Sequence, residues 1–338
     1  MKIGNFDLNK DILIIAEIGN NHEGNFDLAK EMINQAKSAG AHAVKFQRVR
    51  AEHLIDLNNK QRFQQIKSYE FTDNQFEELH DHANNLGLMF LCTPFDLSGV
   101  SALNKLVSAF KIASSDNNFY PLIESIANTG KPIIMSSGLA DYKQIKKAKD
   151  LIEKIWRKNK VNQELAILHC VSSYPTPIEE SNLSSITALK KKFKCTIGYS
   201  DHTLGIEAAV TAVALGARII EKHFTIDKNL SSFRDHQLSA DPKEFTELVR
   251  RIKETSLMLG NEKKEIQDSE KNNIKAIRRS IVANKDLPAG KVLKFEDLDW
   301  IRLAGGLLPG QEKSIIGKKL SKSIKRGELL TSNIFKRS

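Results

Sequence analysis

Short apolar runs rich in β-branched and aromatic residues recur along the chain, and amphipathic helical patterns such as FDLAKEMINQAKSAGA and GIEAAVTAVALGA separate them. Several of these helical patterns stop at a glycine, as helix C-termini commonly do. The alternation is typical of βα units that build a parallel sheet. Eight strands are predicted: ILIIAEIG (12–19), AVKFQ (43–47), LMFLCTPF (88–95), AFKIASSD (109–116), PIIMSSG (132–138), LAILHCVSSYP (165–175), TIGYSDH (196–202) and RIIEKHF (218–224).

Eight strands with intervening helices over roughly 260 residues predict a (β/α)8 TIM barrel. An open doubly wound sheet is the alternative fold. It is disfavoured because EIGNNHEG, after the first strand, lacks the glycine spacing of a dinucleotide-binding turn.

A change of composition marks the end of the predicted barrel. The stretch NEKKEIQDSEKNNIKAIRRS is charged and nearly free of apolar residues, which indicates an exposed helix or linker. The segment after it has short strand patterns, Gly and Pro turns, and two similar phrases, KDLPAGKVLKFEDL and KSIKRGELLTSNI. We expect a catalytic barrel over residues 1–262, a linker over 263–279, and a small β-rich domain over 280–338. So short a domain has a marginal core of its own, and we expect it to dock on a barrel.

Polar residues crowd the C-terminal ends of the predicted strands, where TIM barrels place their active sites. A purely structural barrel offers no reason for this crowding, because desolvating charges without partners is costly. The residues at these ends include Glu17, Lys45, Gln47, Thr93, Lys111, Ser114, Asp116, Ser172, Tyr174, Ser200, His202, Glu221 and His223.

Two histidines end consecutive predicted strands. His202 and His223 are 21 positions apart, which suits neighbouring strands and excludes one helix face. Two adjacent imidazoles suit a borderline divalent cation such as Mn²⁺ or Zn²⁺, with positions left for water and substrate. Glu17 could support such a site or act as acid or base. The alternative is that each histidine only hydrogen-bonds a nearby carboxylate, Asp201 or Glu221.

Two lysines are predicted to point into the barrel. Lys45 and Lys111 lie in the middle of AVKFQ and AFKIASSD, where an unpaired ammonium group would be expensive. With the hydroxyls of Thr93, Ser114 and Ser200 they predict a cationic pocket for a phosphate or carboxylate.

Composition narrows the class of protein. The chain has a hydrophobic content of 41%, a net charge of +10 and no apolar run long enough for a signal sequence near its beginning, so we expect a soluble cytoplasmic protein. The lysines lie on helical stretches without interleaved aromatics, which predicts solvated faces, a preference for small anions, and no nucleic-acid or membrane partner. Cys92, Cys170 and Cys195 fit neither a disulfide framework nor a metal motif, and are expected to be buried free thiols.

A series of long motifs, in this order, resembles the sialic acid synthases and their relatives that make legionaminic and pseudaminic acids. The motifs are IIAEIGNNHEGNFDLAKEMINQAKSAGAHAVKFQ, CTPFD, FKIASSD, YPLIESIANTGKPIIMSSG, HCVSSYPTP, IGYSDHTLG and EKHFTID. The terminal segment resembles the antifreeze-like (SAF) domain of that family. The resemblance covers almost the whole chain.

This resemblance implies condensation of phosphoenolpyruvate with the open-chain aldehyde of an N-acylated hexosamine and water, giving a nine-carbon 2-keto-3-deoxy acid and phosphate. It implies that His202 and His223 hold Mn²⁺ or Mg²⁺ and that Glu17 stands near the metal and the nucleophile. Arg302, in WIRLAGG, matches an arginine that the family inserts into the partner's barrel, which implies a domain-swapped homodimer. Phosphoenolpyruvate would be bound by Lys45, Thr93, Lys111, Ser114, Ser172 and Ser200, and the sugar by Gln47, Asp116, Tyr174, Asp235 and Arg302.

The sequence departs from the family pattern mainly on the sugar side. Asp116 stands where the N-acetylneuraminate branch has Glu, and SFRDHQLSADP replaces the usual PGPD segment around Asp235. Ala276 takes the place of a linker aromatic, and the motif around Arg302 lacks its usual proline. On the phosphoenolpyruvate side, Ser172 replaces an Asn. The reaction is therefore better supported than the identity of the hexosamine.

Other functions remain open from the sequence alone. They are synthesis of another 3-deoxy sugar acid from phosphoenolpyruvate, a metal aldolase that uses pyruvate, and a sugar-binding protein without catalysis. A pyruvate aldolase would not need the two lysines, and an inactive binder would be expected to lack a metal ligand or a lysine, yet all are present.

Overall fold

The computed structural model describes residues 1–335. The chain divides into two compact units, one over Met1–Gly260 and the other from Asn261 onward. Residues 336–338, the last of the predicted C-terminal domain, lie outside the described residues.

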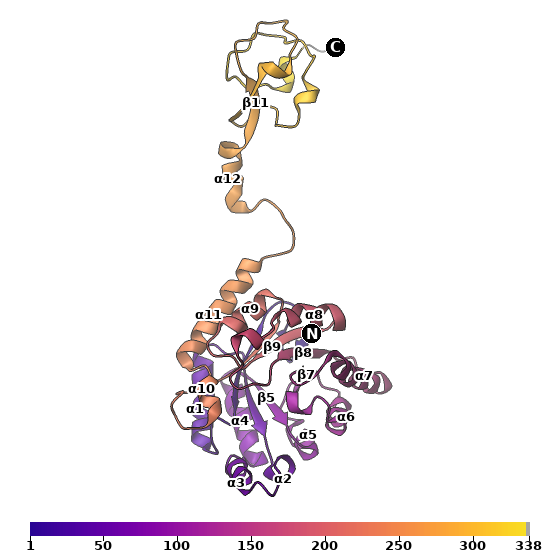
Figure 1. Cartoon of the computed structure of the whole chain (residues 1–338), viewed down its shortest axis with the longest axis vertical. Helices are drawn as coiled ribbons and strands as arrows, with labels where there is room; N and C mark the ends of the chain where they lie inside the picture. Colours follow the sequence, from indigo (N-terminus) through magenta and orange to yellow (C-terminus); the bar gives the residue numbers. More distant parts are fainter. Residues whose placement is uncertain (336–338) are drawn as a thin grey trace. The chain divides into compact units, whose positions relative to one another are not determined.

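The first unit contains the predicted eight parallel strands, which confirms the barrel (Figure 1). Their order in the sheet is β5-β4-β3-β10-β9-β8-β7-β6, and the two edge strands, β5 and β6, lie against each other and close the ring. The strands are β3 (Leu13–Gly19), β4 (Ala43–Arg48), β5 (Met89–Pro94), β6 (Phe110–Ile112), β7 (Ile133–Ser136), β8 (Leu165–Cys170), β9 (Thr196–Asp201) and β10 (Ile219–His223).

Helices surround these strands and bury their apolar faces against them (Figure 1). Side-chain caps begin several of them, as when Asn25 accepts from the backbone N–H of Leu28 at the start of α1. The helices of this unit are α1 (Phe26–Ser38), α2 (Ala51–Leu54), α3 (Lys60–Ser68), α4 (Asp73–Asn85), α5 (Leu97–Leu103), α6 (Tyr120–Asn128), α7 (Tyr142–Lys158), α8 (Ser184–Phe193), α9 (Glu207–Ala214), α10 (Arg234–Leu238) and α11 (Pro242–Leu259).

The strands alternate strictly between two environments. In β3, Ile14, Ala16 and Ile18 belong to the apolar layer between sheet and helices, whereas Leu13 and Ile15 belong to a separate cluster inside the barrel. The hairpin of β1 (Lys2–Ile3) and β2 (Phe6–Asp7) adds Ile3 to that inner cluster, which also contains Met1 and Leu8. Apolar packing therefore fills the N-terminal half of the barrel, and the next inward position on β3 is Glu17.

The second unit has a small core of its own around the antiparallel pair β11 (Arg279–Ala283) and β12 (Leu298–Arg302). The helix α12 (Asp268–Ile277) precedes this pair and lies in the stretch predicted as an exposed helix or linker. Arg302 is exposed and pairs with Arg279 across the two strands. No helix of residues 1–335 is both long and apolar enough to cross a membrane.

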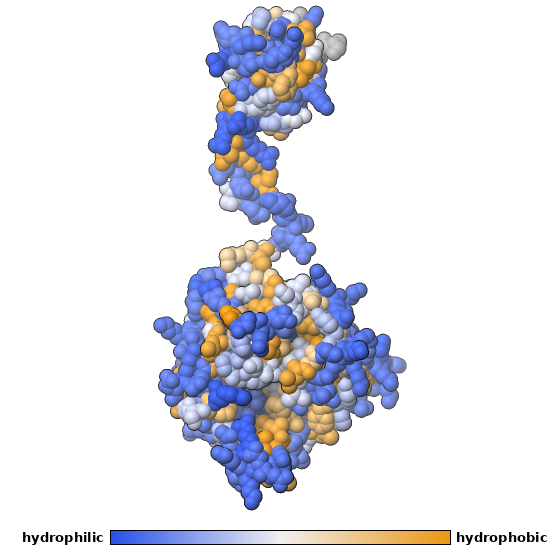
Figure 2. Space-filling view, in the orientation of Figure 1, coloured by the Kyte–Doolittle hydropathy of each residue, from blue (hydrophilic) through white to orange (hydrophobic). Residues whose placement is uncertain are grey.

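Two helices of the first unit carry a high density of positive charge. Residues 142–160 carry eight Lys or Arg against two acids, and residues 190–194 carry four lysines. These residues belong to α7, α8 and the positions just after them, and Figure 2 shows the α7 edge of the first unit as hydrophilic. Residues 1–260 nevertheless carry 33 Lys or Arg against 31 Asp or Glu, so most of the net charge of +10 belongs to residues 261–338 and does not account for a preference of the barrel for small anions.

Candidate active site

A cavity of about 500 Å³ opens at the C-terminal ends of the strands. Twelve of the fourteen predicted site residues line it: Glu17, Lys45, Gln47, Thr93, Lys111, Ser114, Ser172, Tyr174, Ser200, His202, His223 and Asp235. The other two do not lie in the described lining. Asp116 is half-buried at the end of a short 3-10 turn, and Arg302 belongs to the second unit. The lining also includes Glu221, which the sequence had not assigned a role, and Ser136.

The strand register brings the charged residues together. Glu17 is paired in the sheet with Lys45 on β4 and with His223 on β10, and Glu221 is paired with Ser200 on β9. Glu17, Lys45 and Glu221 each lie two residues after an apolar inward residue on the same strand, Ile15, Ala43 and Ile219, because side chains alternate with a period of two. At the end of β3 the register shifts at Gly19, whose φ of +56° favours glycine.

Both predicted inward lysines are paired with buried carboxylates. Lys45 Nζ lies 2.8 Å from Glu17 Oε2 and 3.7 Å from Glu221 Oε2, while Lys111 Nζ lies 3.6 Å from Glu221 Oε1. Lys111 also donates to the Ser136 hydroxyl at 2.7 Å, and the Ser200 hydroxyl donates to Glu221 at 2.9 Å. Each of the four charged side chains is at most 6% exposed. The two lysines are therefore neutralised by neighbours rather than left unpaired.

The two carboxylates of this network have opposite pKa shifts. Burial raises the pKa of Glu17 and outweighs the opposing effect of Lys45, while the nearby Glu221 raises it further. Burial also disfavours the charged form of Glu221, but Lys111 and Lys45 together outweigh it and hold the pKa of this group at about 2. Burial lowers the pKa of Lys111, against the effect of Glu221. Glu221 is thus the fixed negative charge and Glu17 the group poised to exchange a proton.

Small hydroxyl-bearing residues form a tight cradle beside Lys111. The Ser114 hydroxyl accepts from the backbone N–H of Gly138 at 3.2 Å, and the Ser172 hydroxyl is buried without a hydrogen-bond partner. A Cβ atom on Gly138 would lie 2.3 Å from Ser172 Oγ and 2.7 Å from Ser114 Oγ, so any larger residue there would have to displace both hydroxyls. The cradle leaves one buried hydroxyl free to donate to a ligand.

The two predicted metal-ligating histidines lie side by side, with ring centroids 5.5 Å apart. His202 Nδ1 lies 2.8 Å from the carbonyl oxygen of Val171 and therefore carries a proton, which leaves Nε2 with its lone pair free. His223 Nδ1 is buried without a partner, and burial lowers the pKa of His223, which keeps the ring neutral. Neither ring is hydrogen-bonded to Asp201 or Glu221: Asp201 pairs with Lys222 instead.

These observations fit a divalent cation held by the two adjacent imidazole rings. Residues 1–335 contain no group of three or more His, Cys, Asp or Glu side chains arranged for a metal ion. A cation here would accordingly have two protein ligands, and its other positions would be left for water and substrate oxygens.

All three cysteines are free thiols, as expected, but Cys195 is half-buried and not buried as predicted. Cys170 lines the cavity, where its sulfur accepts from the Ser114 hydroxyl at 3.4 Å and lies 3.8 Å from His202 Nδ1. The residue is therefore part of the site wall, a placement that motif spacing in the sequence could not show.

The side of the cavity assigned to the sugar combines residues from β4, the loop after β8 and α10. Gln47 donates to Glu17 at 2.8 Å and accepts from Asn20 at 3.1 Å, so its amide is fixed in orientation. Tyr174 lies 4.1 Å from His202 between ring centroids, and the Arg234 guanidinium lies 4.7 Å from the centre of the Tyr174 ring. Asp235 accepts from Arg234 at 3.2 Å.

Asp116 makes stability depend on pH. Burial raises its pKa to about 6, although the Ser115 hydroxyl and Lys111 oppose this, whereas an unfolded chain has an Asp pKa of about 3.9. Between these values the folded state keeps a proton that the unfolded chain has lost, so this group lowers stability as the pH rises from about 4 to about 6. We expect Asp116→Asn to be more stable than wild type at pH 8 but not at pH 4 in thermal unfolding. An equal change at both pH values would contradict this role.

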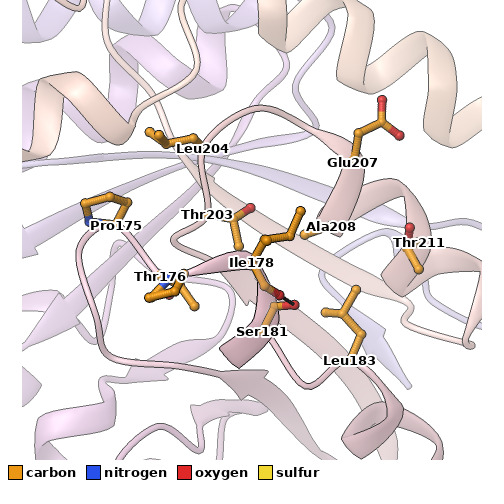
Figure 3. Close-up of a pocket in the computed structure, with 11 residues that line it drawn as sticks. Pro175, Thr176, Ile178, Ser181, Leu183, Thr203, Leu204, Glu207, Ala208 and Thr211 are labelled. Atoms are coloured by element: carbon orange, nitrogen blue, oxygen red, sulfur yellow. Dashed lines mark hydrogen bonds between the residues drawn. The ribbon is translucent and has the colours of Figure 1, made fainter.

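A second hollow of about 450 Å³ lies between the loop after β8 and the start of α9 (Figure 3). Its walls are mostly apolar, with Pro175, Ile178, Leu183 and Leu204, and Glu207 is its one charged lining residue in the described chain. It contains none of the lysines and histidines of the cavity at the strand ends. The chemistry is therefore concentrated in that cavity.

A TIM barrel with paired buried lysines and adjacent histidines at its mouth, followed in the chain by a small β domain, has the architecture of a barrel enzyme whose active site lies at the strand ends. The sequence matches the NeuB family over residues 32–264 and the SAF domain over residues 278–333. The chain belongs to the NeuB family and is an enzyme of the transferase class, and its C-terminal part is a SAF domain, as the resemblance indicated.

Similar proteins span nearly the whole chain. An N,N'-diacetyllegionaminic acid synthase of Campylobacter jejuni is 38% identical over 95% of this chain and 99% of its own length. A pseudaminic acid synthase of the same organism is 35% identical over 99% of this chain and all of its own length. The crystal structure of an N-acetylneuraminic acid synthetase from Leptospira borgpetersenii superposes with a TM-score of 0.76 and 38% identity, covering 81% of this chain and 94% of that one.

Proposed function

We propose that this enzyme condenses phosphoenolpyruvate with the open-chain aldehyde of an N-acylated hexosamine and water, forming a nine-carbon 2-keto-3-deoxy sugar acid and phosphate. The observation that carries the proposal is the buried network of Glu17, Lys45, Lys111 and Glu221 beside two histidines at the barrel mouth of a NeuB family member. The similar proteins make legionaminic, pseudaminic and N-acetylneuraminic acids, so the product belongs to this group of sugar acids.

The reaction balances without an oxidant or reductant. The C2–C3 π electrons of the enol phosphate form the new carbon–carbon bond to the aldehyde carbon, and the aldehyde oxygen gains a proton. Water adds to C2 and loses its protons. The bond from C2 to the phosphate oxygen then breaks, its electrons leave with phosphate, and a ketone remains at C2.

The phosphoenolpyruvate side would be the floor of the cavity. Lys45, Thr93, Lys111, Ser114, Ser172 and Ser200 bind its phosphate and carboxylate groups, and the partnerless Ser172 hydroxyl supports this placement. Glu17, whose pKa burial raises, accepts or donates the proton exchanged with water or with the sugar oxygen. Gln47, Tyr174 and Asp235 contact the sugar, together with Asp116 and with Arg302 of a second subunit in a domain-swapped homodimer.

His202 and His223 would hold the divalent cation, Mn²⁺ or Mg²⁺. Such an ion supplies Lewis-acid stabilisation of the negative charge that develops on the aldehyde oxygen. The lone pair on His202 Nε2 is oriented by the hydrogen bond from Nδ1 to Val171.

Phosphate release from phosphoenolpyruvate tests this function. Purified protein with Mn²⁺ should release phosphate only when a suitable acceptor is present, among N-acetylmannosamine, its 6-phosphate, diacetamido sugars and mannose, and EDTA should abolish the release. Accumulation of the ketoacid in equal amount would identify the acceptor. Formation of the ketoacid with pyruvate in place of phosphoenolpyruvate, or no phosphate release with any acceptor from folded protein, would contradict the proposal.

A further inference from the structure

The segment 225–239, which follows β10, carries Phe233, Arg234 and Asp235 to the cavity. It lies outside the barrel sheet, and its one helix, α10, is only five residues long. A β-bridge between Phe224 and Ala240 joins the two ends of the segment, and the Thr225 N–H donates to the Ala240 carbonyl oxygen at 3.1 Å. This pairing lies outside residues 233–235, so the position of these three side chains depends on further contacts.

The loop that follows β3 supplies one attachment through Glu23 and His236. Glu23 Oε1 accepts from the Ser231 hydroxyl at 2.6 Å and lies 3.0 Å from His236 Nε2. A carboxylate only accepts hydrogen bonds, so His236 Nε2 carries a proton. The other ring nitrogen lies 2.7 Å from Thr225 Oγ1, and the His236 side chain is fully buried. One imidazole thus joins both ends of the segment to Glu23.

A second attachment runs in parallel. The Asn21 amide donates to the carbonyl oxygen of Phe224 at 2.8 Å and to the Ser239 hydroxyl oxygen at 2.9 Å. The Ser239 hydroxyl in turn donates to the backbone oxygen of Asp235 at 2.5 Å. Two contacts therefore hold Asp235 in place. One is the hydrogen bond to its backbone oxygen, and the other is the attachment of the neighbouring His236 to Glu23.

The backbone around Glu23 is shaped to present this side chain. Glu23 has a φ of +47°, in the left-handed region that residues other than glycine seldom adopt. Gly24 follows with a φ of +81°, and a Cβ atom there would lie 2.0 Å from the carbonyl oxygen of Ser68. The loop is thus held against the end of α3 in the conformation that points Glu23 toward the segment.

We infer that Glu23 and His236 are positioning residues that hold the 225–239 segment, and with it Asp235 and Phe233, against the acceptor side of the cavity. They do not line the cavity themselves and act through the residues that do. The Phe233 ring packs on Tyr69 with centroids 5.4 Å apart, which fixes the outer end of the wall. The inference rests on the proposed function, because it assigns this wall to the acceptor sugar.

Steady-state kinetics of His236→Ala and Glu23→Ala test the inference. The KM for the acceptor should rise at least tenfold, while the KM for phosphoenolpyruvate should stay within twofold, because the anion cradle lies on other strands. Glu23→Gln keeps an acceptor oxygen for Ser231 and His236, and it should restore the acceptor KM to within about threefold of wild type. Lys228→Ala is the matched control, because Lys228 lies on the same segment but makes only a partly exposed ion pair with Glu244 on α11, and its removal should change neither KM.

Hydrogen exchange of residues 225–239 gives a readout that does not depend on turnover. We expect faster exchange of this segment in His236→Ala than in wild type, with the barrel strands unchanged. An unchanged acceptor KM in active His236→Ala protein, or unchanged exchange of the segment, would overturn the inference. A variant with a lower Tm but both KM values unchanged would show a purely structural role. Absence of turnover in wild type would instead refute the proposed function, and the exchange comparison would still decide whether the pair anchors the segment.

Discussion

Replacing Glu221 with glutamine is expected to lower the free energy of unfolding by about 3–5 kcal/mol, because it removes one charge from a fully buried network. Glutamine keeps the shape and can still accept from Ser200. Lys45 would keep Glu17 as a partner, but Lys111 would lose its carboxylate and keep only neutral hydrogen-bond acceptors. Chemical denaturation at pH 7 measures the loss.

The same variant also tests whether the cavity floor binds an anion. Phosphoenolpyruvate would supply the negative charge that Glu221→Gln has removed, so it should raise the Tm of the variant by more than it raises that of wild type. Glu247→Gln is the control, since this exposed glutamate pairs with Arg250 on the surface of α11 and should cost less than about 1 kcal/mol. A loss no larger than that of the control, or equal stabilisation of variant and wild type by phosphoenolpyruvate, would contradict the network as described.

Replacing His223 with alanine is expected to reduce kcat roughly a thousandfold, because metal-ion charge stabilisation is worth several kcal/mol in the transition state. Since His223 Nδ1 has no hydrogen-bond partner, its removal breaks no hydrogen bond at that atom, and the variant should fold. Mn²⁺ binding, followed by electron paramagnetic resonance of the free ion, should weaken in parallel with activity.

Removal of a histidine outside the site shows whether the loss of kcat and Mn²⁺ binding is specific to His223. His80 lies on α4, does not line the cavity, and bonds Asp81 and Asn84. His80→Ala should retain Mn²⁺ binding and kcat within about twofold of wild type. If His223→Ala bound Mn²⁺ as tightly as wild type, the two histidines would not be the metal site.

The periodicity of the chain was enough to predict the barrel. Apolar runs separated by amphipathic helices gave eight strands, and their ends gave eleven of the twelve predicted residues that line the cavity, because parallel strands in a barrel all present their C-terminal ends to one mouth. Lys45 and Lys111 were predicted to point inward from their mid-strand positions, and they do. The resemblance, and not the pattern, supplied the reaction and the sugar-side residues.

Glu221 shows what periodicity could not supply. It lies two residues before His223, so the period of a strand places both side chains on one face, but the sequence does not show which charges lie beside Glu221. The tertiary structure shows this: Glu221 lies between Lys45 and Lys111, while Lys222 on the other face pairs with Asp201. The place of Cys170 in the cavity wall likewise follows from the pairing of β8 with β9, which the sequence does not show.

By itself, the sequence determined the strands, their order of appearance and the residue types at their ends, because these depend on local alternation and turn chemistry. Only the tertiary structure decided which charges neutralise one another and how the 225–239 segment is held by Glu23 and His236. These contacts join residues up to 213 positions apart, and their energies depend on distance and burial, which no local pattern encodes.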